Sequence, residues 1–255
     1  MMAEAVSRTT RRVLVINPVG VDPWEESDTK YLRGLARRGT TIDVIHLDGG
    51  PDSLESAVNE AQAIPRILRR VVEKGTGYDG VLINCFMDPG VTAAREYLDI
   101  PVAGPAESGM NLANMLGSRF SILSVLKSLG PRHRTHARVL GLSERLASVV
   151  DLGIPVLDLQ KNSDRTVEVA VNRARLAIER DGAEVIVLGC TGLAALAEAI
   201  RKRLEVPVVE PLAAALKVLE STIDLGLTHS RAGLYRRPDP RKIHGYGLPL
   251  KGARG

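Results

Sequence analysis

Short apolar runs rich in Val, Ile and Leu alternate with longer stretches of helical character along most of the chain. Such runs between polar stretches are typical of buried parallel strands, and the stretches between them are long enough for crossover helices. Eight strands are predicted in this way, at residues 13–18, 41–46, 80–85, 100–103, 120–125, 154–159, 184–190 and 206–209. The pattern indicates an α/β fold.

The strand pattern occurs twice along the chain. In each half the third strand starts just after an acidic residue, Asp79 or Glu184, and ends on a cysteine, Cys85 or Cys190. Any α/β protein repeats strands loosely, but the shared offset of the cysteines favours an internal duplication. We therefore predict two similar lobes, each a four-stranded parallel sheet flanked by helices, related by a pseudo-twofold axis with the active site between them.

The composition is that of an ordinary globular protein. Of the 255 residues 44% are hydrophobic but only 3% are aromatic, so the core must consist of aliphatic side chains. No apolar run approaches the roughly 20 residues that span a bilayer, and the first twelve residues lack the apolar centre of a signal peptide. We expect a soluble, cytoplasmic protein that has no membrane partner.

The basic charge is concentrated at the C-terminal end of the chain. The formal net charge is +4, and residues 229–255 hold seven Lys or Arg against the single acid Asp239, so the rest of the chain is slightly acidic. No nucleic-acid-binding motif accompanies this tail. We interpret it as a solvated or subunit-contacting segment and expect no nucleic-acid partner.

The two cysteines are candidates for chemistry. The chain has no CxxC motif, and its five histidines show no metal-ligand spacing, so neither a zinc site nor a structural disulfide is expected. A thiol at the carboxyl end of a parallel strand lies where ligands bind, and a helix that starts there would favour the thiolate. A single such cysteine is more often buried and inert, but Cys85 and Cys190 form a matched pair.

A matched pair of thiols is suited to racemisation. This reaction removes a proton from one face of a stereocentre and returns a proton to the other face, so it needs two acid/base groups on opposite sides of the ligand. We expect one thiolate and one thiol in the free protein, with their roles exchanged by the direction of the reaction.

Several segments around these positions resemble motifs of the aspartate/glutamate racemase superfamily, most closely those of its hydantoin racemase branch. The resemblance covers roughly residues 11–228. It rests on residues 16–18, 84–90, 100–107, 119–124, 189–192 and 207–211.

The resemblance implies a particular lobe division. Residues 1–107 and 211–255 would form the first lobe, and residues 108–210 would form the second. A last helix near residues 212–225 would return to the first lobe. The resemblance also implies homo-oligomers, a small-molecule substrate, and neither a cofactor nor a metal.

The resemblance further assigns roles to residues. Cys85 and Cys190 would be the catalytic acid/base pair. Ligand would be bound by the side chain of Asn17, and largely through backbone N–H groups by four residues that follow the cysteines: Phe86, Met87, Thr191 and Gly192.

Two other polar residues are candidates for the site. Glu107 follows the fourth strand and could orient a substrate amine, although a glutamate near a helix start often only favours the helix dipole. Ser124, at the end of the fifth strand, could donate to ligand, although packing or capping is equally plausible.

The substrate is left open by one departure from the hydantoin branch. Members commonly follow Asn-Pro with a second Asn and a Ser or Thr, whereas Val19-Gly20-Val21-Asp22 follows Pro18 here. The leading prediction is a racemase or epimerase acting on a hydantoin, an amino acid or a related carbon acid. Alternatives are a maleate-type cis-trans isomerase, an arylmalonate-type decarboxylase, and a non-catalytic ligand-binding accessory protein of the same fold.

Overall fold

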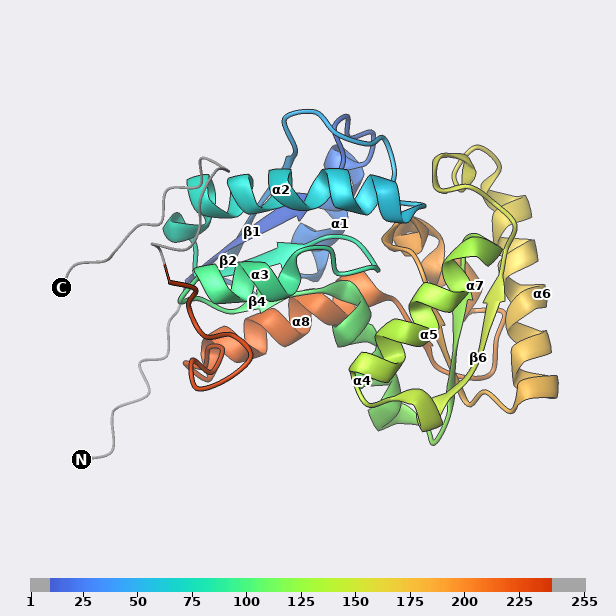
Figure 1. The fold of residues 1–255 in the computed structure, drawn as a ribbon. Coiled ribbons are helices and arrows are strands. Elements are labelled where there is room, and N and C mark those ends of the chain that lie inside the picture. Colours follow the sequence, from blue (N-terminus) through green and yellow to red (C-terminus); the bar gives the residue numbers. More distant parts are fainter. Residues whose placement is uncertain (1–9, 240–255) are drawn as a thin grey trace.

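The computed structural model describes residues 10–239, which form two α/β lobes side by side (Figure 1). The first lobe contains β1 (Arg11–Asn17), α1 (Glu25–Leu35), β2 (Thr40–His46), α2 (Ala57–Lys74), β3 (Gly80–Ile83), α3 (Val91–Tyr97) and β4 (Val102–Ala103). After α4 (Pro105–Leu116), the second lobe contains β5 (Phe120–Ser124), α5 (Gly130–Val139), β6 (Leu146–Asp151), α6 (Ser163–Asp181), β7 (Val185–Leu188), α7 (Ala197–Arg201) and β8 (Val208–Val209). The last helix is α8 (Pro211–Asp224).

The two sheets have the same topology. Each has four parallel strands, in the order β2-β1-β3-β4 in the first lobe and β6-β5-β7-β8 in the second. The prediction of an α/β fold with two four-stranded parallel sheets is confirmed. Because β3 and β7 occupy equivalent places, the cysteines that follow them are equivalent too.

Aliphatic side chains fill both faces of each sheet. On the first sheet, α2 and α3 cover one face around Ile67, whereas α1 and α8 cover the other around Leu216. On the second sheet, α6 and α7 cover one face around Val171, and α4 and α5 pack on the other around Phe120. Strands buried on both faces explain why the apolar runs are continuous and do not alternate.

The chain passes between the lobes at two helix starts. Helix α4 packs on the second sheet through Met110, whereas α8 runs back beneath the first sheet, where Leu219 is buried (Figure 1). The two helices also meet each other, and a Cβ added at Gly109 would lie 3.2 Å from the Pro211 side chain. A side chain at position 109 would therefore be tight against Pro211. The chain therefore crosses between the lobes near the starts of α4 and α8. The lobe boundaries at residues 107 and 210 stay a prediction.

One predicted strand is wrong. The run 154–159 does not pair with a sheet; the sixth strand is β6, which lies eight residues earlier. Pro155 has no N–H for a ladder, and residues Val156–Asp158 form a 3₁₀ turn whose first backbone N–H is bound by the Glu55 side chain at 2.6 Å. Strand β6 was missed because all of its residues are only half-buried, so its apolar pattern is weak.

The start of the basic tail packs on its own chain. His229 accepts a hydrogen bond from the backbone N–H of Val102 at 2.8 Å, and the Arg231 guanidinium donates to the Arg95 carbonyl at 2.7 Å. Four of the seven basic residues of the tail, Arg241, Lys242, Lys251 and Arg254, lie outside the described residues. Within residues 10–239, no helix is both long enough and apolar enough to span a bilayer.

Candidate active site

A cavity of about 660 Å³, its mouth included, lies between the lobes and is lined by residues of both. Apolar side chains make up most of the wall. The lining also has eight polar or thiol-bearing residues among its nineteen: Asn17, Asp28, Ser53, Asn84, Cys85, His133, Cys190 and Thr191. No Lys or Arg is among the described residues of the lining.

Both cysteines line this cavity, one from each lobe. Cys85 lies two residues beyond the end of β3, and Cys190 two residues beyond the end of β7. Both are free thiols of intermediate exposure. The internal duplication that the sequence predicts thus places two chemically equivalent groups in the wall of one cavity.

The free thiols are less acidic than the sequence suggested. Burial raises the pKa of Cys85 and of Cys190 to about 12, and the backbone N–H groups of Met87 and Gly192 offset only part of that rise. The prediction of a resting thiolate at a helix start is therefore wrong. Helix α3 begins at Val91, six residues after Cys85, and a 3₁₀ segment of six residues follows Cys190. No α-helix begins at either sulfur, and burial outweighs the effect of the backbone N–H groups there.

The loop after Cys85 is fixed by Asp88. Its carboxyl group accepts hydrogen bonds from the backbone N–H groups of Ala106 at 2.9 Å and Glu107 at 2.8 Å, and its own backbone adopts the left-handed conformation. A Cβ at Gly104 would lie 2.4 Å from the carboxyl carbon, so only glycine fits there. This arrangement holds Phe86 and Met87, both predicted to bind ligand, in the cavity wall.

The loop around Cys190 contains two glycines that lie against neighbouring atoms. A Cβ at Gly192 would lie 3.4 Å from the Cys190 sulfur, and a Cβ at Gly189 would clash with the Leu123 carbonyl at 2.6 Å. Thr191 and Gly192 line the cavity, as Phe86 and Met87 do on the other side. Glycine at these two positions lets backbone approach both the sulfur and the neighbouring strand.

A buried polar network forms the floor on the side of the first lobe. The Asn17 and Asn84 side chains each donate to the Asp28 carboxyl group at 3.0 Å, and Asn84 also donates to Asn17 at 2.8 Å. The amide nitrogen of Asn84 is used twice, but its Oδ1 is buried and has no hydrogen-bond partner within residues 10–239. Burial and the charges of Asp22 and Glu210 raise the pKa of Asp28 to about 7, against the effect of the two asparagines.

The sequence predictions included Asn17 in this network but neither Asn84 nor Asp28. Asp28 follows no motif, but it lies four residues before the buried Leu32 and therefore on the inner stripe of α1. An acidic residue on the otherwise apolar face of a helix is the sequence feature that could have identified Asp28.

Two predicted binding residues do not line the cavity. Glu107 forms an ion pair with Arg95 beside a neighbouring pocket, with an Oε2–Nη1 distance of 2.9 Å. Ser124 is fully buried; it donates to the Leu126 carbonyl at 2.9 Å and contacts His133 at 3.1 Å. Glu107 therefore links α4 to Arg95 of α3. Ser124 contacts His133, which is itself in the cavity lining. Sequence reasoning did not single out His133.

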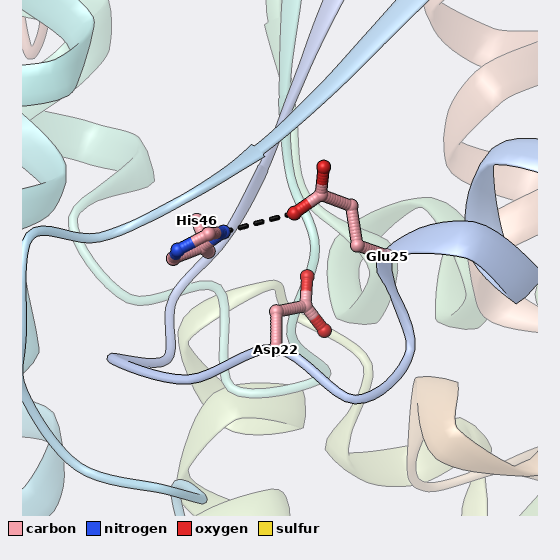
Figure 2. Close-up of side chains that lie close together, drawn as sticks. All are labelled: Asp22, Glu25 and His46. Carbon is pink, nitrogen blue, oxygen red and sulfur yellow. Dashed lines mark hydrogen bonds and ion pairs between the residues drawn. The ribbon is translucent and has the colours of Figure 1, made fainter.

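The side chains of Asp22, Glu25 and His46 lie close together and form a second polar cluster (Figure 2). None of the three is in the cavity lining. One ligand atom from each of Asp22, Glu25 and His46 lies within 4.8 Å of the others, and such oxygen and nitrogen atoms are of the kind that bind divalent ions. These groups already have protein partners. His46 contacts Glu25 at 2.9 Å, and Asp22 accepts from Asn17 at 2.6 Å and from the backbone of Trp24 at 2.9 Å. Through these contacts the three side chains stabilise the loop before α1.

Comparison with known proteins places the chain among racemases. A family model described as Asp/Glu/hydantoin racemase matches residues 13–219. The hydantoin racemase of Pseudomonas sp. (strain NS671) is 34% identical over 240 residues, which cover 92% of this chain and 94% of that protein. The hydantoin racemase of Paenarthrobacter aurescens is 34% identical over 237 residues, which cover 91% and 99%.

Solved structures agree with the sequence comparison. The allantoin racemase from Pseudomonas fluorescens superposes with a TM-score of 0.88 at 33% identity, covering 92% of this chain and 100% of that chain. The resemblance noted in the sequence is confirmed, and relatives of this similarity are isomerases by name. The chain belongs to the Asp/Glu/hydantoin racemase family.

Proposed function

We propose that the protein is a cofactor-independent racemase that uses Cys85 and Cys190 as an acid/base pair on a 5-substituted hydantoin or related cyclic ureide. The observation that carries this proposal is the placement of two equivalent thiols, one from each lobe, in the wall of a single cavity. A planar ligand between them has one thiol for each face of its acidic carbon.

The character of the cavity favours an uncharged ligand. Its described lining has no Lys or Arg to pair with a carboxylate, and it holds the Asp28 carboxyl group. The buried Asn84 Oδ1 has no partner in the part of the chain that the structure describes and can accept an N–H group. A hydantoin ring offers N–H donors and carries no carboxylate. The names of the relatives, hydantoin and allantoin racemase, point to the same class of ring.

In the proposed reaction one thiol acts as a thiolate and removes the proton on C5, which is acidified by the adjacent carbonyl group. The opposite thiol then donates its proton to the other face. Negative charge that develops on the carbonyl oxygen would be stabilised by the backbone N–H groups that follow the cysteines. The raised pKa values make a thiolate rare, but they also make it a stronger base for a weak carbon acid.

The proton balance of this scheme is simple. Once one of the two thiols has been ionised, the reaction starts from one thiolate and one thiol and ends with the two exchanged, so no oxidant, metal or external acid is consumed. Asp28, whose pKa of about 7 allows it to gain or lose a proton near neutral pH, is the lining group best suited to take up the proton that a thiol releases.

The two free cysteines fit a reducing compartment, and we propose that the reaction takes place in the cytoplasm.

The first test of this proposal is turnover. Single enantiomers of 5-benzylhydantoin, 5-methylhydantoin, allantoin, aspartate and glutamate are incubated with the protein, and loss of optical rotation is followed. We expect racemisation of at least one cyclic ureide and none of the amino acids. Racemisation of an amino acid alone would overturn the substrate class.

The same experiment includes maleate and phenylmalonate. Isomerisation or decarboxylation of these without racemisation of any ureide would instead select the isomerase or decarboxylase alternatives. A decarboxylase needs one proton donor only, so it would keep activity when one of the two cysteines is replaced.

A further inference from the structure

His133 is a buried imidazole in the wall of the active-site cavity. It lies on α5 of the second lobe with 1% of its surface exposed. The Phe86 ring meets it edge to face, with the ring centroids 5.2 Å apart. One ring nitrogen, Nε2, lies 3.1 Å from the Ser124 hydroxyl oxygen, whereas Nδ1 is buried and has no hydrogen-bond partner among the described residues.

The surroundings determine which nitrogen holds the proton. The Ser124 hydroxyl group has a single hydrogen, and it donates this hydrogen to the Leu126 carbonyl at 2.9 Å. The Ser124 oxygen is then the acceptor in its contact with His133, so Nε2 bears the hydrogen. Nδ1 of the neutral ring consequently presents a lone pair.

The ring is neutral across the ordinary pH range. Burial lowers the pKa of His133 to about 4, and the positive charges of His136 and Arg132 act in the same direction. A buried acceptor without a donor is uncommon in folded proteins and costs stability. Such a group in a cavity wall is typical of a position that a ligand completes.

We infer that His133 is a ligand-binding residue that accepts a ring N–H group of the substrate through Nδ1. The inference rests on the proposed function, because the cyclic ureide supplies the donor. Asn84 Oδ1, which also lacks a partner among the residues that the structure describes, lies in the lining on the side of the first lobe. A ring with N–H groups on two sides satisfies one acceptor from each lobe, so binding would also hold the lobes together around it.

The test combines a variant with methylated substrates. His133→Phe keeps an aromatic ring against Phe86 and removes the acceptor. Racemisation of 5-benzylhydantoin is compared with that of its N1-methyl and N3-methyl derivatives. In wild type, one methyl position should lower kcat/KM by about tenfold or more, because the donor is lost. His133→Phe should lower kcat/KM for unmethylated 5-benzylhydantoin by a similar factor. It should then act on the unmethylated ring and on that methylated derivative with similar kcat/KM.

A steric effect of the methyl group would give a different pattern. In that case the wild type and His133→Phe would show the same discrimination between parent and methylated rings, and the inference would be wrong. Ser124→Ala serves as the matched variant, because it removes the partner of Nε2 and leaves Nδ1 in place. It should retain the discrimination, with only a partial loss of kcat/KM.

A measurement on the unmodified protein covers the case in which His133→Phe does not fold. The ¹⁵N signal of His133 Nδ1 should move toward the hydrogen-bonded range when 5-benzylhydantoin is added, and should not move with the derivative methylated at the critical nitrogen. An unchanged signal under saturating hydantoin overturns the inference. Wild-type turnover reports separately on the proposed function, so racemisation with an unmoved His133 signal would leave that function standing.

Discussion

The Asp88 carboxyl group binds the backbone N–H of Glu107 at 2.8 Å and thereby ties the loop that carries Cys85 to the first turn of α4. Because α4 packs on the second sheet, this bond crosses the junction between the lobes. Burial raises the pKa of Asp88 well above its usual value, and the charge of Glu107 adds to this rise. The position of one proposed acid/base group therefore depends on a single buried side chain three residues away.

Replacing Asp88 should weaken both the fold and catalysis. Asp88→Asn keeps one oxygen acceptor but turns an NH₂ group toward backbone N–H donors. Loss of a helix-capping interaction costs about 1–2 kcal/mol, so chemical denaturation at pH 4, where the raised pKa of Asp88 does not yet reduce the stability of the wild type, should show a decrease of that size in the free energy of unfolding. We expect kcat to fall more than KM rises, since Cys85 is displaced. Unchanged stability and kcat would show that the carboxyl group does not position the loop.

Gly104→Ala should have the same effect by a different route. Its new Cβ would lie 2.4 Å from the Asp88 carboxyl carbon and would push that carboxyl group away from α4. Gly34→Ala is the matched control, because a Cβ there has no neighbour within 4 Å and Gly34 lies inside α1. The control should be more stable than wild type by about 0.5–1 kcal/mol. Equal thermal shifts in the two variants would contradict the tight contact at Gly104.

Asp28 should make stability depend on pH. Its pKa is raised from 3.8 to about 7 in the folded protein, so the folded state holds this proton more tightly than the unfolded chain does. The stabilising contribution is complete below about pH 4 and is lost as the pH rises through 7. Asp28→Asn should therefore exceed wild type in stability at pH 8, by at most about 4 kcal/mol. The difference in stability between Asp28→Asn and wild type should shrink toward pH 4. Urea denaturation of both proteins at pH 8 and pH 4 measures this difference. The same difference at both pH values would contradict a raised pKa of Asp28.

The two thiols should react slowly with alkylating agents in the free protein. Because burial raises both pKa values to about 12, the thiolate is scarce at pH 7.5. Iodoacetamide should modify Cys85 and Cys190 more than about a hundredfold more slowly than an unperturbed thiol. Mass spectrometry of the two peptides over time gives the rates. Modification as fast as that of glutathione would indicate a thiolate stabilised in the resting site.

Most of the fold could be predicted from sequence because strands buried on both faces leave continuous Val, Ile and Leu runs. The failure at 154–159 has the opposite cause, since an apolar run containing Pro155 forms a turn, while β6 is only half-buried and has no such pattern. Cys85 and Cys190 could be found because the duplication places them at the same offset in each half.

Side chains that helices carry into the cavity were harder to predict. Asp28 and His133 belong to no motif and are brought to the cysteines only by packing of α1 and α5. Each nevertheless interrupts the apolar stripe of its helix, since His133 lies four residues before the buried Ala137. Glu107 lines a neighbouring pocket and Ser124 is buried beside His133, and no sequence pattern separates such positions from the cavity lining.

The most direct measurement of the central claim is solvent deuterium exchange at C5 of each hydantoin enantiomer, with Cys85→Ser and Cys190→Ser assayed separately. The account predicts that wild type exchanges and inverts both enantiomers, whereas each variant loses racemisation. Each variant should retain slow exchange of only the enantiomer whose proton faces its remaining thiol, and the two variants should prefer opposite enantiomers. Full racemisation by either variant, or the same enantiomer preference in both, would contradict a pair of thiols acting from opposite faces.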